Sequence, residues 1–296
     1  MNVQVLMSVY NGQKYLSQQI ESVLAQEDVA VDLLIRDDGS KDDSIRIIQS
    51  FMEKHSNVHL IEGENIGVIP SFYELSLQAE PEFDYYAYCD QDDVWLKDKL
   101  IRAISFLQKP DIPQLYCSKT QLVDDELGFL QLSHLGVPTK QSAMIQNIVI
   151  GCTSVMNHAL HQLVIEKVPD YQAIRMHDSW FYKLGIFFGE VYFDDEARIL
   201  YRQHANNAVG LSSSFLGRIL KSIDDGRKRL YLNELIEFQK CWGDKLSEKD
   251  YRENQRYIEA KQQLSKRIGY LSDPYVKKQT LLKNTWFKIQ FLFNWV

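Results

Sequence analysis

The densest group of carboxylates in the chain follows an apolar stretch with the length of a buried strand. Tyr85–Cys89 (YYAYC) leads directly into Asp90-Gln91-Asp92-Asp93. Carboxylates at positions i and i+2 of an extended segment point the same way, so Asp90 and Asp92 can face one site. Mg²⁺ and Mn²⁺ prefer oxygen ligands and take further ligands from substrate phosphates. The pattern favours a divalent cation beside a leaving diphosphate. The alternative is an acidic turn that caps a helix over 94–107.

A second acidic group, Asp37-Asp38-Gly39-Ser40, follows another short apolar stretch, Val31–Ile35. Aspartate and serine at such a position can cap the next helix by accepting its free backbone N–H groups. A carboxylate at a strand end can also accept an N–H from a pyrimidine ring. The residues alone leave both interpretations open.

The elements that must position these groups alternate between strand and helix, as in a layered α/β fold. Apolar runs predict strands at 3–9, 31–35, 58–61, 85–89 and 114–117, with further short strands at 128–130 and within 191–201. Helical spacing predicts helices at 15–24, 44–54, 70–79, 94–107, 158–168 and 178–185, with a helix or strand at 142–150. Ligands of open α/β sheets bind beyond the carboxyl ends of the strands, so we expect the first-half motifs to share one edge.

A phosphoacceptor receiver domain is the competing α/β interpretation, because it also uses a paired acid at a strand end. In that fold the acidic pair follows the first strand. Here the first strand ends in Ser8-Val9-Tyr10-Asn11-Gly12 and the pair follows the second strand. The order of the motifs therefore argues against a receiver.

Charge divides the chain unevenly. Residues 1–214 carry 16 basic and 30 acidic side chains, whereas residues 215–296 carry 17 basic and 10 acidic ones. An acidic body argues against binding to the phosphate backbone of a nucleic acid. A boundary is expected near Gly210-Leu211-Ser212-Ser213-Ser214, giving a domain at 1–212 and a helical extension at 213–296, with helices at 216–242, 247–269 and 274–296.

Four motifs together resemble one enzyme family. Val9-Tyr10-Asn11-Gly12, Asp37-Asp38-Gly39-Ser40, Asn65-Ile66-Gly67 and Asp90-Gln91-Asp92-Asp93 have the order and spacing of a family 2 glycosyltransferase over roughly residues 1–212. The resemblance implies a GT-A fold, an inverting single displacement and a divalent metal, Mg²⁺ or Mn²⁺. It also implies a metal ligand at Asp92 and a set of donor-site residues: Ser8, Tyr10, Asn11, Asp37, Asp38, Asn65, Gly67, Asp90, Gln91 and Arg202.

Three longer segments resemble the bacterial rhamnosyltransferases that build cell-wall or capsular polysaccharides. The first is Cys89–Trp95 (CDQDDVW), and the second is Met176–Trp180 (MHDSW), where Ser179 stands in place of a frequent tryptophan. The third is Tyr201–Asn207 (YRQHANN), where Ala205 replaces a glycine. The implied donor is dTDP-L-rhamnose, with a UDP-hexose as the alternative. A non-catalytic sugar-nucleotide-binding scaffold is the alternative from another class.

These segments supply the remaining candidates. Inverting transfer needs a base that takes the proton of the acceptor hydroxyl, and Asp178, beside the aromatic Trp180, is our candidate; the alternative is a helix cap. His204 is a candidate metal ligand and Arg202 a candidate phosphate partner. The acceptor is expected to contact a further set of residues: Trp95, Gly151, Cys152, Thr153, His177 and Trp180.

The C-terminal segment 276–296 combines four lysines with many aromatic and aliphatic residues and has no acid. Such a composition is typical of a helix that lies at a membrane interface. Dimerisation and packing on the catalytic body are the alternatives. No run of 18 apolar residues occurs, and Met1 leads almost directly into a strand. We therefore expect a cytoplasmic enzyme, peripheral at the inner face of the cell membrane, that acts on a lipid-linked oligosaccharide acceptor.

Overall fold

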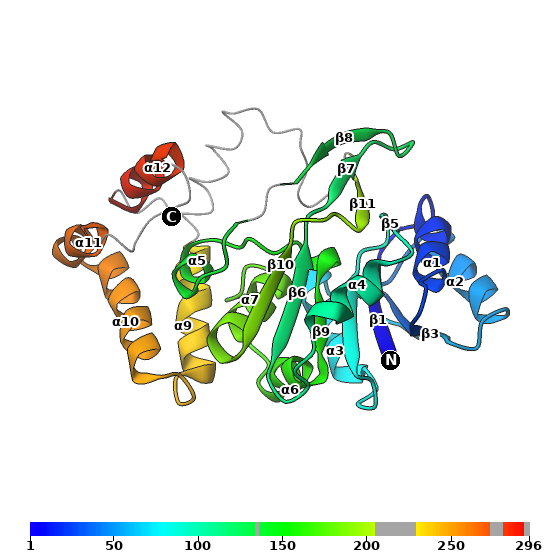
Figure 1. Ribbon diagram of the computed structural model, residues 1–296, viewed down its shortest axis with the longest axis horizontal. Coiled ribbons are helices and arrows are strands. Elements are labelled where there is room, and N and C mark those ends of the chain that lie inside the picture. Colours follow the sequence, from blue (N-terminus) through cyan, green and yellow to red (C-terminus); the bar gives the residue numbers. More distant parts are fainter. Residues whose placement is uncertain (134–135, 205–228, 273–280, 293–296) are drawn as a thin grey trace. The chain divides into compact units, whose positions relative to one another are not determined.

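The computed structural model describes residues 1–133, 136–204, 229–272 and 281–292 (Figure 1). Its chain contacts divide it into two compact units. The first contains residues 1–135, 149–168 and 189–208, and the second contains 136–148, 169–188 and 209–296. The boundary expected at 212/213 lies outside the described residues.

The first unit is built on a sheet with the strand order β10-β6-β9-β4-β1-β2-β3. Its strands are β1 (Asn2–Val9), β2 (Ala30–Asp37), β3 (Val58–Glu62), β4 (Tyr85–Cys89), β6 (Gln114–Ser118), β9 (Val155–Asn157) and β10 (Glu190–Asp194). Only β9 runs antiparallel to its neighbours, β4 and β6. The expected α/β class with a mostly parallel central sheet is confirmed.

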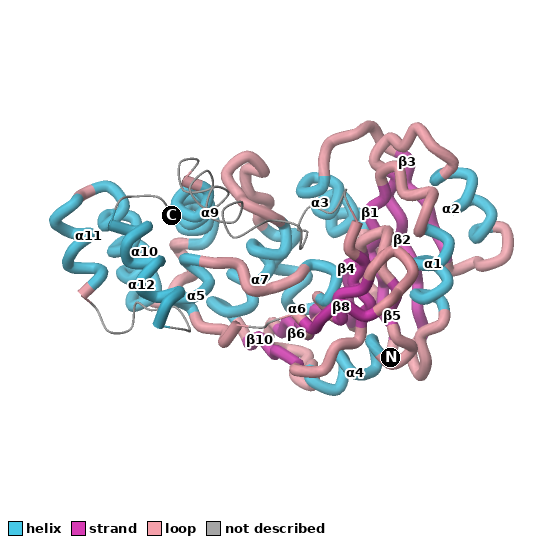
Figure 2. The backbone as a smooth tube through the Cα atoms, turned by 90° about the horizontal axis from the view of Figure 1, so that it is seen from above, coloured by secondary structure: helices cyan, strands magenta, loops and turns pink. Residues whose placement is uncertain are grey.

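Helices cover both faces of this sheet, since β1 buries side chains on both sides. Val5 and Met7 belong to a core that also contains Ile20 of α1 (Leu16–Leu24) and Leu100 of α4 (Lys99–Phe106). The opposite face packs on α3 (Val68–Gln78) and α6 (His158–Glu166). Figure 2 shows α1 and α2 (Ser44–Met52) on one side of β1 and β2 and α3 on the other.

A smaller sheet, with the order β5-β11-β7-β8, completes the first unit. It contains β5 (Val94–Trp95), β7 (Gln121–Val123), β8 (Phe129–Leu132) and β11 (Ile199–Arg202). The helix expected over 94–107 is therefore wrong at its start. Residues 94 and 95 pair with β11 instead, and α4 begins only at Lys99.

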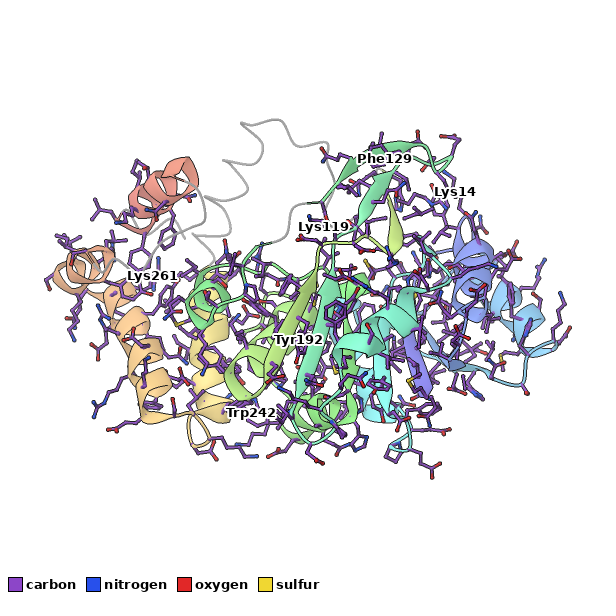
Figure 3. All side chains as sticks on the ribbon, in the orientation of Figure 1. Lys14, Lys119, Phe129, Tyr192, Trp242 and Lys261 are labelled. Atoms are coloured by element: carbon purple, nitrogen blue, oxygen red, sulfur yellow. The ribbon has the colours of Figure 1, made fainter. Side chains whose placement is uncertain are left out.

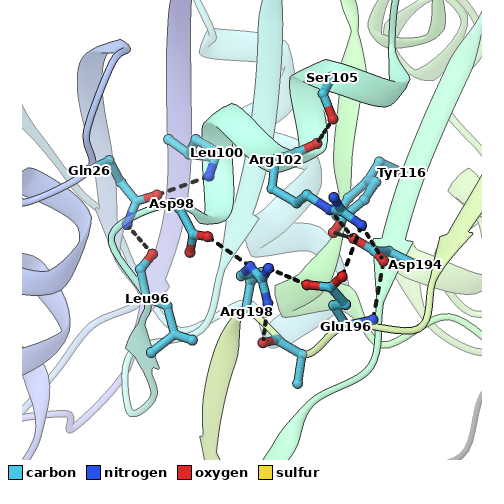
Figure 4. Close-up of polar contacts among 11 residues, drawn as sticks. Gln26, Leu96, Asp98, Leu100, Arg102, Ser105, Tyr116, Asp194, Glu196 and Arg198 are labelled. Carbon is cyan, nitrogen blue, oxygen red and sulfur yellow. Dashed lines mark hydrogen bonds and ion pairs between the residues drawn. The ribbon is translucent and has the colours of Figure 1, made fainter.

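The segment between β10 and β11 is held by charged contacts (Figure 4). Asp194 accepts hydrogen bonds from Arg102 Nε at 2.7 Å and from the hydroxyl group of Tyr116 at 2.9 Å. Arg198 pairs with Asp98 at 3.0 Å and also with Glu196. These contacts connect α4 to the chain that enters β11, which carries two of the candidate residues to the site.

The second unit is helical in its described part. It contains α5 (Lys140–Ile145), α7 (His177–Phe188), α9 (Leu230–Trp242), α10 (Glu248–Gln262), α11 (Leu264–Leu271) and α12 (Leu281–Leu292). The segment expected as a helix or strand at 142–150 forms a helix only up to Ile145. Trp242, at the end of α9, is fully buried against Phe188 of α7, with ring centroids 5.3 Å apart (Figure 3).

The two C-terminal helices, α11 and α12, pack on each other and on α10 through aromatic rings. Phe291 of α12 stacks on Tyr270 of α11 with centroids 5.2 Å apart. It also contacts Tyr257 of α10, with centroids 5.6 Å apart. Residues 276–280 and 293–296 of the expected interfacial segment lie outside the described residues. Among the described helices, none is long and apolar enough to cross a membrane.

Candidate functional site

The first-half motifs meet at one edge of the large sheet, as expected. The strand register aligns Val9 of β1 with Asp37 of β2, and Asp37 with Glu62 of β3. On the other side of β1, Met7 aligns with Cys89 of β4. Because these pairings are parallel, the four loops that follow the strands leave the sheet side by side.

Hydrogen bonds between the loops connect the predicted donor-site residues. The backbone N–H of Tyr10 donates to Gln91 Oε1 at 2.8 Å, and Gln91 Nε2 donates to the Tyr10 carbonyl oxygen at 3.2 Å. A side chain on Gly12 would collide with Gln91, because its Cβ would lie 2.6 Å from Oε1. The loop after β1 also binds the loop after β2, because the Asn11 N–H donates to Ser40 Oγ at 2.9 Å.

The two neighbouring aspartates after β2 have different partners. Asp37 Oδ2 accepts the N–H groups of Gly39 and Ser40 at 3.0 and 2.8 Å. Asp38 accepts the N–H groups of Ile66 and Gly67, each at 3.0 Å. Asp37 therefore shapes its own turn, whereas Asp38 joins the second motif loop to the third.

Asp38 is also paired with a cation in the buried interior. Arg36 Nη1 lies 2.5 Å from Asp38 Oδ1, and both side chains are buried. Arg36 further donates to Ser71 Oγ at 3.2 Å, and Ser71 Oγ lies 2.7 Å from Ser8 Oγ. Ser8 and Asp38 therefore belong to one hydrogen-bonded group, while Asn65 lies exposed on the adjoining loop.

The two candidate metal ligands lie together in the first unit. His204 Nε2 is 2.8 Å from Asp92 Oδ2, and both side chains keep some exposure to solvent. The His204 ring stacks on Tyr15 with centroids 5.2 Å apart, and the Tyr15 hydroxyl donates to Asp125 at 2.7 Å. Two adjacent ligands of an octahedral ion at about 2.1 Å are roughly 3 Å apart. In this structure Asp92 and His204 form a hydrogen bond, and atoms at this spacing could also serve as two adjacent ligands of one ion.

Arg202 is buried beside this pair and holds the loop that carries Asp92. Its Nε donates to the Asp92 carbonyl oxygen at 2.9 Å, and its Nη2 donates to Gln18 Oε1 at 2.6 Å. Its backbone N–H donates to Asp93 Oδ1 at 3.0 Å. In this arrangement the guanidinium group positions Asp92. A direct contact of Arg202 with phosphate stays a prediction.

A second group of potential ligands lies deeper in the first unit. One oxygen of Asp90, one oxygen of Asp93 and the sulfur of Cys152 lie within 4.8 Å of one another. Burial, together with the charges of Asp92 and Asp90, raises the pKa of Asp93 well above its usual range. Burial likewise raises the pKa of the Cys152 thiol. A soft sulfur donor suits Mg²⁺ or Mn²⁺ less than the oxygen and imidazole donors of Asp92 and His204.

Asp178 lies in the first turn of α7, where the sequence predicted the start of a helix. It is 7% exposed, and its Oδ1 accepts a hydrogen bond from Asn147 Nδ2 at 2.9 Å. Burial raises the pKa of Asp178 to about 7, and the charge of Glu234 adds to this effect. The backbone N–H of Ser179 and the side chain of Asn147 act in the opposite direction. A carboxyl group with a pKa near the working pH suits general base catalysis.

Sequence reasoning missed three residues around Asp178. Asn147 lies just after α5. In the sequence it is one polar residue in an apolar stretch, which is only a weak sign of a functional position. Lys183 and Glu234 form a fully buried ion pair at 2.9 Å, and Ser179 Oγ donates to Glu234 Oε2 at 3.0 Å. A spacing of 51 residues gave no sign that this lysine and glutamate would meet.

Two tryptophans expected to face the acceptor are buried in packing contacts instead. Trp180 is fully buried, and its ring meets Phe238 edge-on with centroids 5.5 Å apart. Trp95 is covered by Lys99, whose Nζ lies 3.5 Å from the ring centroid. Neither ring is exposed to solvent in this structure, and contact of Trp180 and Trp95 with an acceptor stays a prediction.

Cys152, Thr153 and His177, which were also expected at the acceptor, are buried, and Gly151 is half-buried. Cys152 and Thr153 are buried in a short 3₁₀ turn, Gly151–Thr153. His177 is buried, and its ring meets Phe181 edge-on with centroids 5.7 Å apart. Burial lowers the pKa of His177 to about 3, so its imidazole is neutral. Contact of these residues with an acceptor stays a prediction.

Comparisons with known proteins bear on the family and the fold of this chain. The family model described as glycosyl transferase family 2 matches residues 4–167. A dTDP-rhamnosyl transferase from Shigella flexneri is 28% identical over 80% of this chain and 85% of its own length. The crystal structure of S. aureus TarS 1–349 with UDP-GlcNAc has a TM-score of 0.58 at 17% identity, covering 87% of this chain and 70% of that one.

A second solved structure is that of a mannosyltransferase from Pyrobaculum calidifontis in complex with GDP-Man and Mn²⁺. It has a TM-score of 0.56 at 14% identity and covers 99% of this chain and 85% of that one. Both structural likenesses bear on the fold alone.

Proposed function

Because this chain belongs to glycosyl transferase family 2 and has the GT-A fold, we propose that it transfers L-rhamnose from dTDP-β-L-rhamnose to a saccharide acceptor. The transfer inverts the configuration at the anomeric carbon and depends on Mg²⁺ or Mn²⁺. The acceptor is a lipid-linked oligosaccharide in cell-wall or capsular polysaccharide synthesis. The protein works at the inner face of the cell membrane.

The observation that carries the proposed metal-dependent reaction is the contact between Asp92, in the loop after β4, and His204, which follows β11. A carboxylate oxygen and an imidazole nitrogen 2.8 Å apart supply two adjacent ligand positions. A divalent ion held there would neutralise charge on the leaving diphosphate. The Mn²⁺ complex of the structurally similar mannosyltransferase supports the choice of a divalent ion.

The residues of the chain have separate tasks in this reaction. Asp38 and Ser8 belong to the hydrogen-bonded group that forms the base and ribose side of the donor site. Arg202 keeps the Asp92 loop in place through the Asp92 carbonyl oxygen. Asp178 accepts the proton of the attacking hydroxyl group, and Asn147 orients its carboxylate.

Fewer observations support the identity of the donor as dTDP-rhamnose than support the reaction class. It is supported by the relative from Shigella flexneri and by the motif around Trp95. A UDP-hexose donor is the second candidate, because UDP-GlcNAc is bound in a protein of the same fold. The two candidates share the reaction and the metal and differ only in the donor.

The test is calorimetry with dTDP-rhamnose, UDP-glucose and UDP-galactose, each with and without Mn²⁺. We expect Mn²⁺-dependent binding of dTDP-rhamnose and weak binding of the two UDP-sugars. Preference for a UDP-sugar would contradict the rhamnosyl assignment and leave the reaction class intact. Binding of none of the three would favour a non-catalytic scaffold.

A further inference from the structure

Tyr15 immediately precedes α1, and its side chain contacts residues from two distant segments of the first unit. Its ring stacks on the His204 imidazole, with centroids 5.2 Å apart and an angle of 25° between the ring planes. The guanidinium carbon of Arg202 lies 4.5 Å from the centre of the same ring. The Tyr15 hydroxyl group donates to Asp125 Oδ1 at 2.7 Å. The proposed reaction assigns no task to this side chain.

The helix that follows Tyr15 does not require a tyrosine at this position. Tyr15 is the N-cap of α1, but its side chain bonds to Asp125 and not to the described first turn of the helix. Serine, threonine, aspartate and asparagine are the usual N-caps, because their oxygens accept backbone N–H groups. The hydrophobic core is filled by the next residue, Leu16, while Tyr15 is half-buried. The contacts with His204 and Asp125 therefore account for the side chain better than the helix does.

The acceptor of the Tyr15 hydroxyl group lies in a tight turn between β7 and β8. Asp124 Oδ1 accepts the N–H of Gly128 at 2.7 Å, and a side chain on Gly128 would collide with Asp124, because its Cβ would lie 2.6 Å from Oδ2. Arg202 donates to the carbonyl oxygen of Asp125 from the end of β11. The turn and the strand thus fix Asp125, and Asp125 fixes the Tyr15 hydroxyl group.

The backbone of Tyr15 is bound to the loop that carries predicted donor-site residues. The N–H groups of Tyr15 and Leu16 both donate to the carbonyl oxygen of Gly12 at 3.1 Å. Gly12 directly follows the donor-site candidates Tyr10 and Asn11. Tyr15 therefore joins the donor loop, through its backbone, to a candidate metal ligand, through its ring.

A stacked ring restricts the orientation of the His204 imidazole. A histidine side chain can occupy several rotamers, and only some of them direct Nε2 toward Asp92. The ring of Tyr15 lies against the imidazole and limits this choice. A divalent ion bound at Nε2 would withdraw electrons from the imidazole, and the electron-rich face of a tyrosine attracts positive charge. The stack should therefore be more favourable when an ion is bound.

We propose that Tyr15 is a positioning residue for His204. Its ring keeps Nε2 of the imidazole directed at Asp92, and its hydroxyl group keeps the ring in place through Asp125. The part of this role that supports a metal ligand rests on the proposed function. The orientation of the imidazole does not, because the hydrogen bond between His204 and Asp92 joins the two side chains directly.

The first experiment measures Mn²⁺ binding to the full chain through the electron paramagnetic resonance signal of the free ion, with dTDP and, separately, with UDP. We expect Tyr15→Leu to weaken Mn²⁺ binding by roughly tenfold, as for other groups that orient a metal-ligating histidine. Tyr15→Phe keeps the stacked ring and should recover most of the affinity. The matched control is Tyr251→Leu, which changes an exposed tyrosine of α10. Equal affinity of Tyr15→Leu and the wild-type chain would overturn the proposal.

Transfer kinetics distinguish positioning of the ligand from a general loss of structure. Tyr15→Leu should raise the KM for Mn²⁺ and leave kcat at saturating Mn²⁺ close to that of the wild-type chain. A lower kcat with an unchanged KM for Mn²⁺ would indicate partial unfolding and would contradict the positioning role. If Tyr15→Leu does not fold, Asp125→Ala removes the acceptor of the hydroxyl group at a half-buried position and should raise the same KM. An unchanged KM in that variant would also contradict the proposal.

The ¹⁵N NMR signals of the histidine side chains provide a readout that needs neither metal nor reaction. At a fixed pH, Tyr15→Leu should move the Nε2 signal of His204 toward that of a solvent-exposed imidazole, because the hydrogen bond to Asp92 is formed less often. Tyr251→Leu should leave this signal unchanged. Absence of Mn²⁺ binding by the wild-type chain with either nucleotide would count against the proposed function, and the Nε2 signal would then decide the role of Tyr15. An unchanged signal in Tyr15→Leu would refute that role.

Discussion

His204 Nε2 lies 2.8 Å from Asp92 Oδ2, although 112 positions separate the two residues in the chain. β11 makes this possible, because it enters the small sheet between β5 and β7 and ends two residues before His204. Arg202, the last residue of β11, holds the Asp92 carbonyl oxygen from the same strand. The pair is therefore positioned by backbone pairing as well as by its own contact.

Removal of either member of this pair should abolish metal-dependent donor binding. Asp92→Asn and His204→Ala each remove one ligand of the ion, and we expect transfer to fall by about a hundredfold or more. Calorimetry with dTDP-rhamnose and Mn²⁺ should show no metal-dependent binding. The control is Asp111→Asn, the same change at an exposed position. Full Mn²⁺-dependent binding by the Asp92 variant would rule out this metal site.

Asp178→Asn should reduce transfer by about a hundredfold to ten-thousandfold, because the variant has no base, while donor binding persists. In the wild-type chain the carboxylate is the active form, and burial raises its pKa to about 7. The pH profile of kcat/KM should therefore rise with pH and level off above about 7. Transfer at the wild-type rate by Asp178→Asn would show that another group is the base.

The same pKa has a consequence for stability. The folded state keeps a proton on Asp178 up to about pH 7, whereas the unfolded chain loses it near the usual value of 3.8. Between these values the folded state binds more protons, so this group makes the free energy of unfolding fall as pH rises, by about 4 kcal/mol in total. Urea unfolding of the Asp178→Asn variant at several pH values between 4 and 7 measures this effect. The free energy of unfolding of the variant should lack this part of the decrease with pH.

Asn147 should act on the reaction only through Asp178. Asn147→Leu removes a donor that stabilises the ionised carboxylate, so the pKa of Asp178 should rise further. The acid limb of the kcat/KM profile should move to higher pH by about one unit. Activity should recover at high pH. Gln146→Leu, at the neighbouring position, is the control, and an equal profile for both variants would exclude a positioning role for Asn147.

The buried pair Lys183–Glu234 gives a prediction about stability. Both side chains are fully buried 2.9 Å apart, so Glu234→Gln leaves an uncompensated buried charge and should cost about 3–5 kcal/mol. Replacing both residues, as Lys183→Met with Glu234→Leu, should restore most of that loss. Urea unfolding of the two single variants and the double variant measures the coupling. Additive effects would mean that the two charges do not interact.

The C-terminal helices carry exposed apolar residues that suit a membrane surface. Leu264 and Ile268 lie one turn apart on α11 and are 59% and 58% exposed. Changing both to Glu should reduce sedimentation with anionic liposomes by roughly tenfold, since both apolar contacts are lost. Leu77→Glu, an exposed leucine of α3, is the control. Unchanged sedimentation together with loss of a dimer on a sizing column would favour dimerisation instead.

The sequence by itself determined the first four strands of the large sheet and the edge that carries their motifs. The apolar runs at β1, β2, β3 and β4 each end in a polar motif, and parallel strands place such ends at one edge. The sequence also named Asp92 and His204 as candidate metal ligands, because the motifs of a known family contain both residues, and their role as ligands stays a prediction. Local patterns carry this information, since each strand and its loop lie within a few residues of one another.

Only the tertiary structure decided which side chains are buried and which distant ones meet. The pattern placed Trp180 beside Asp178, but packing against Phe238 of α9 closed its ring off from solvent. Burial in the folded chain also raised the pKa of Asp178, which no local pattern predicts. Burial and long-range contact depend on how helices far apart in the chain pack together, and no local spacing of residues encodes that packing.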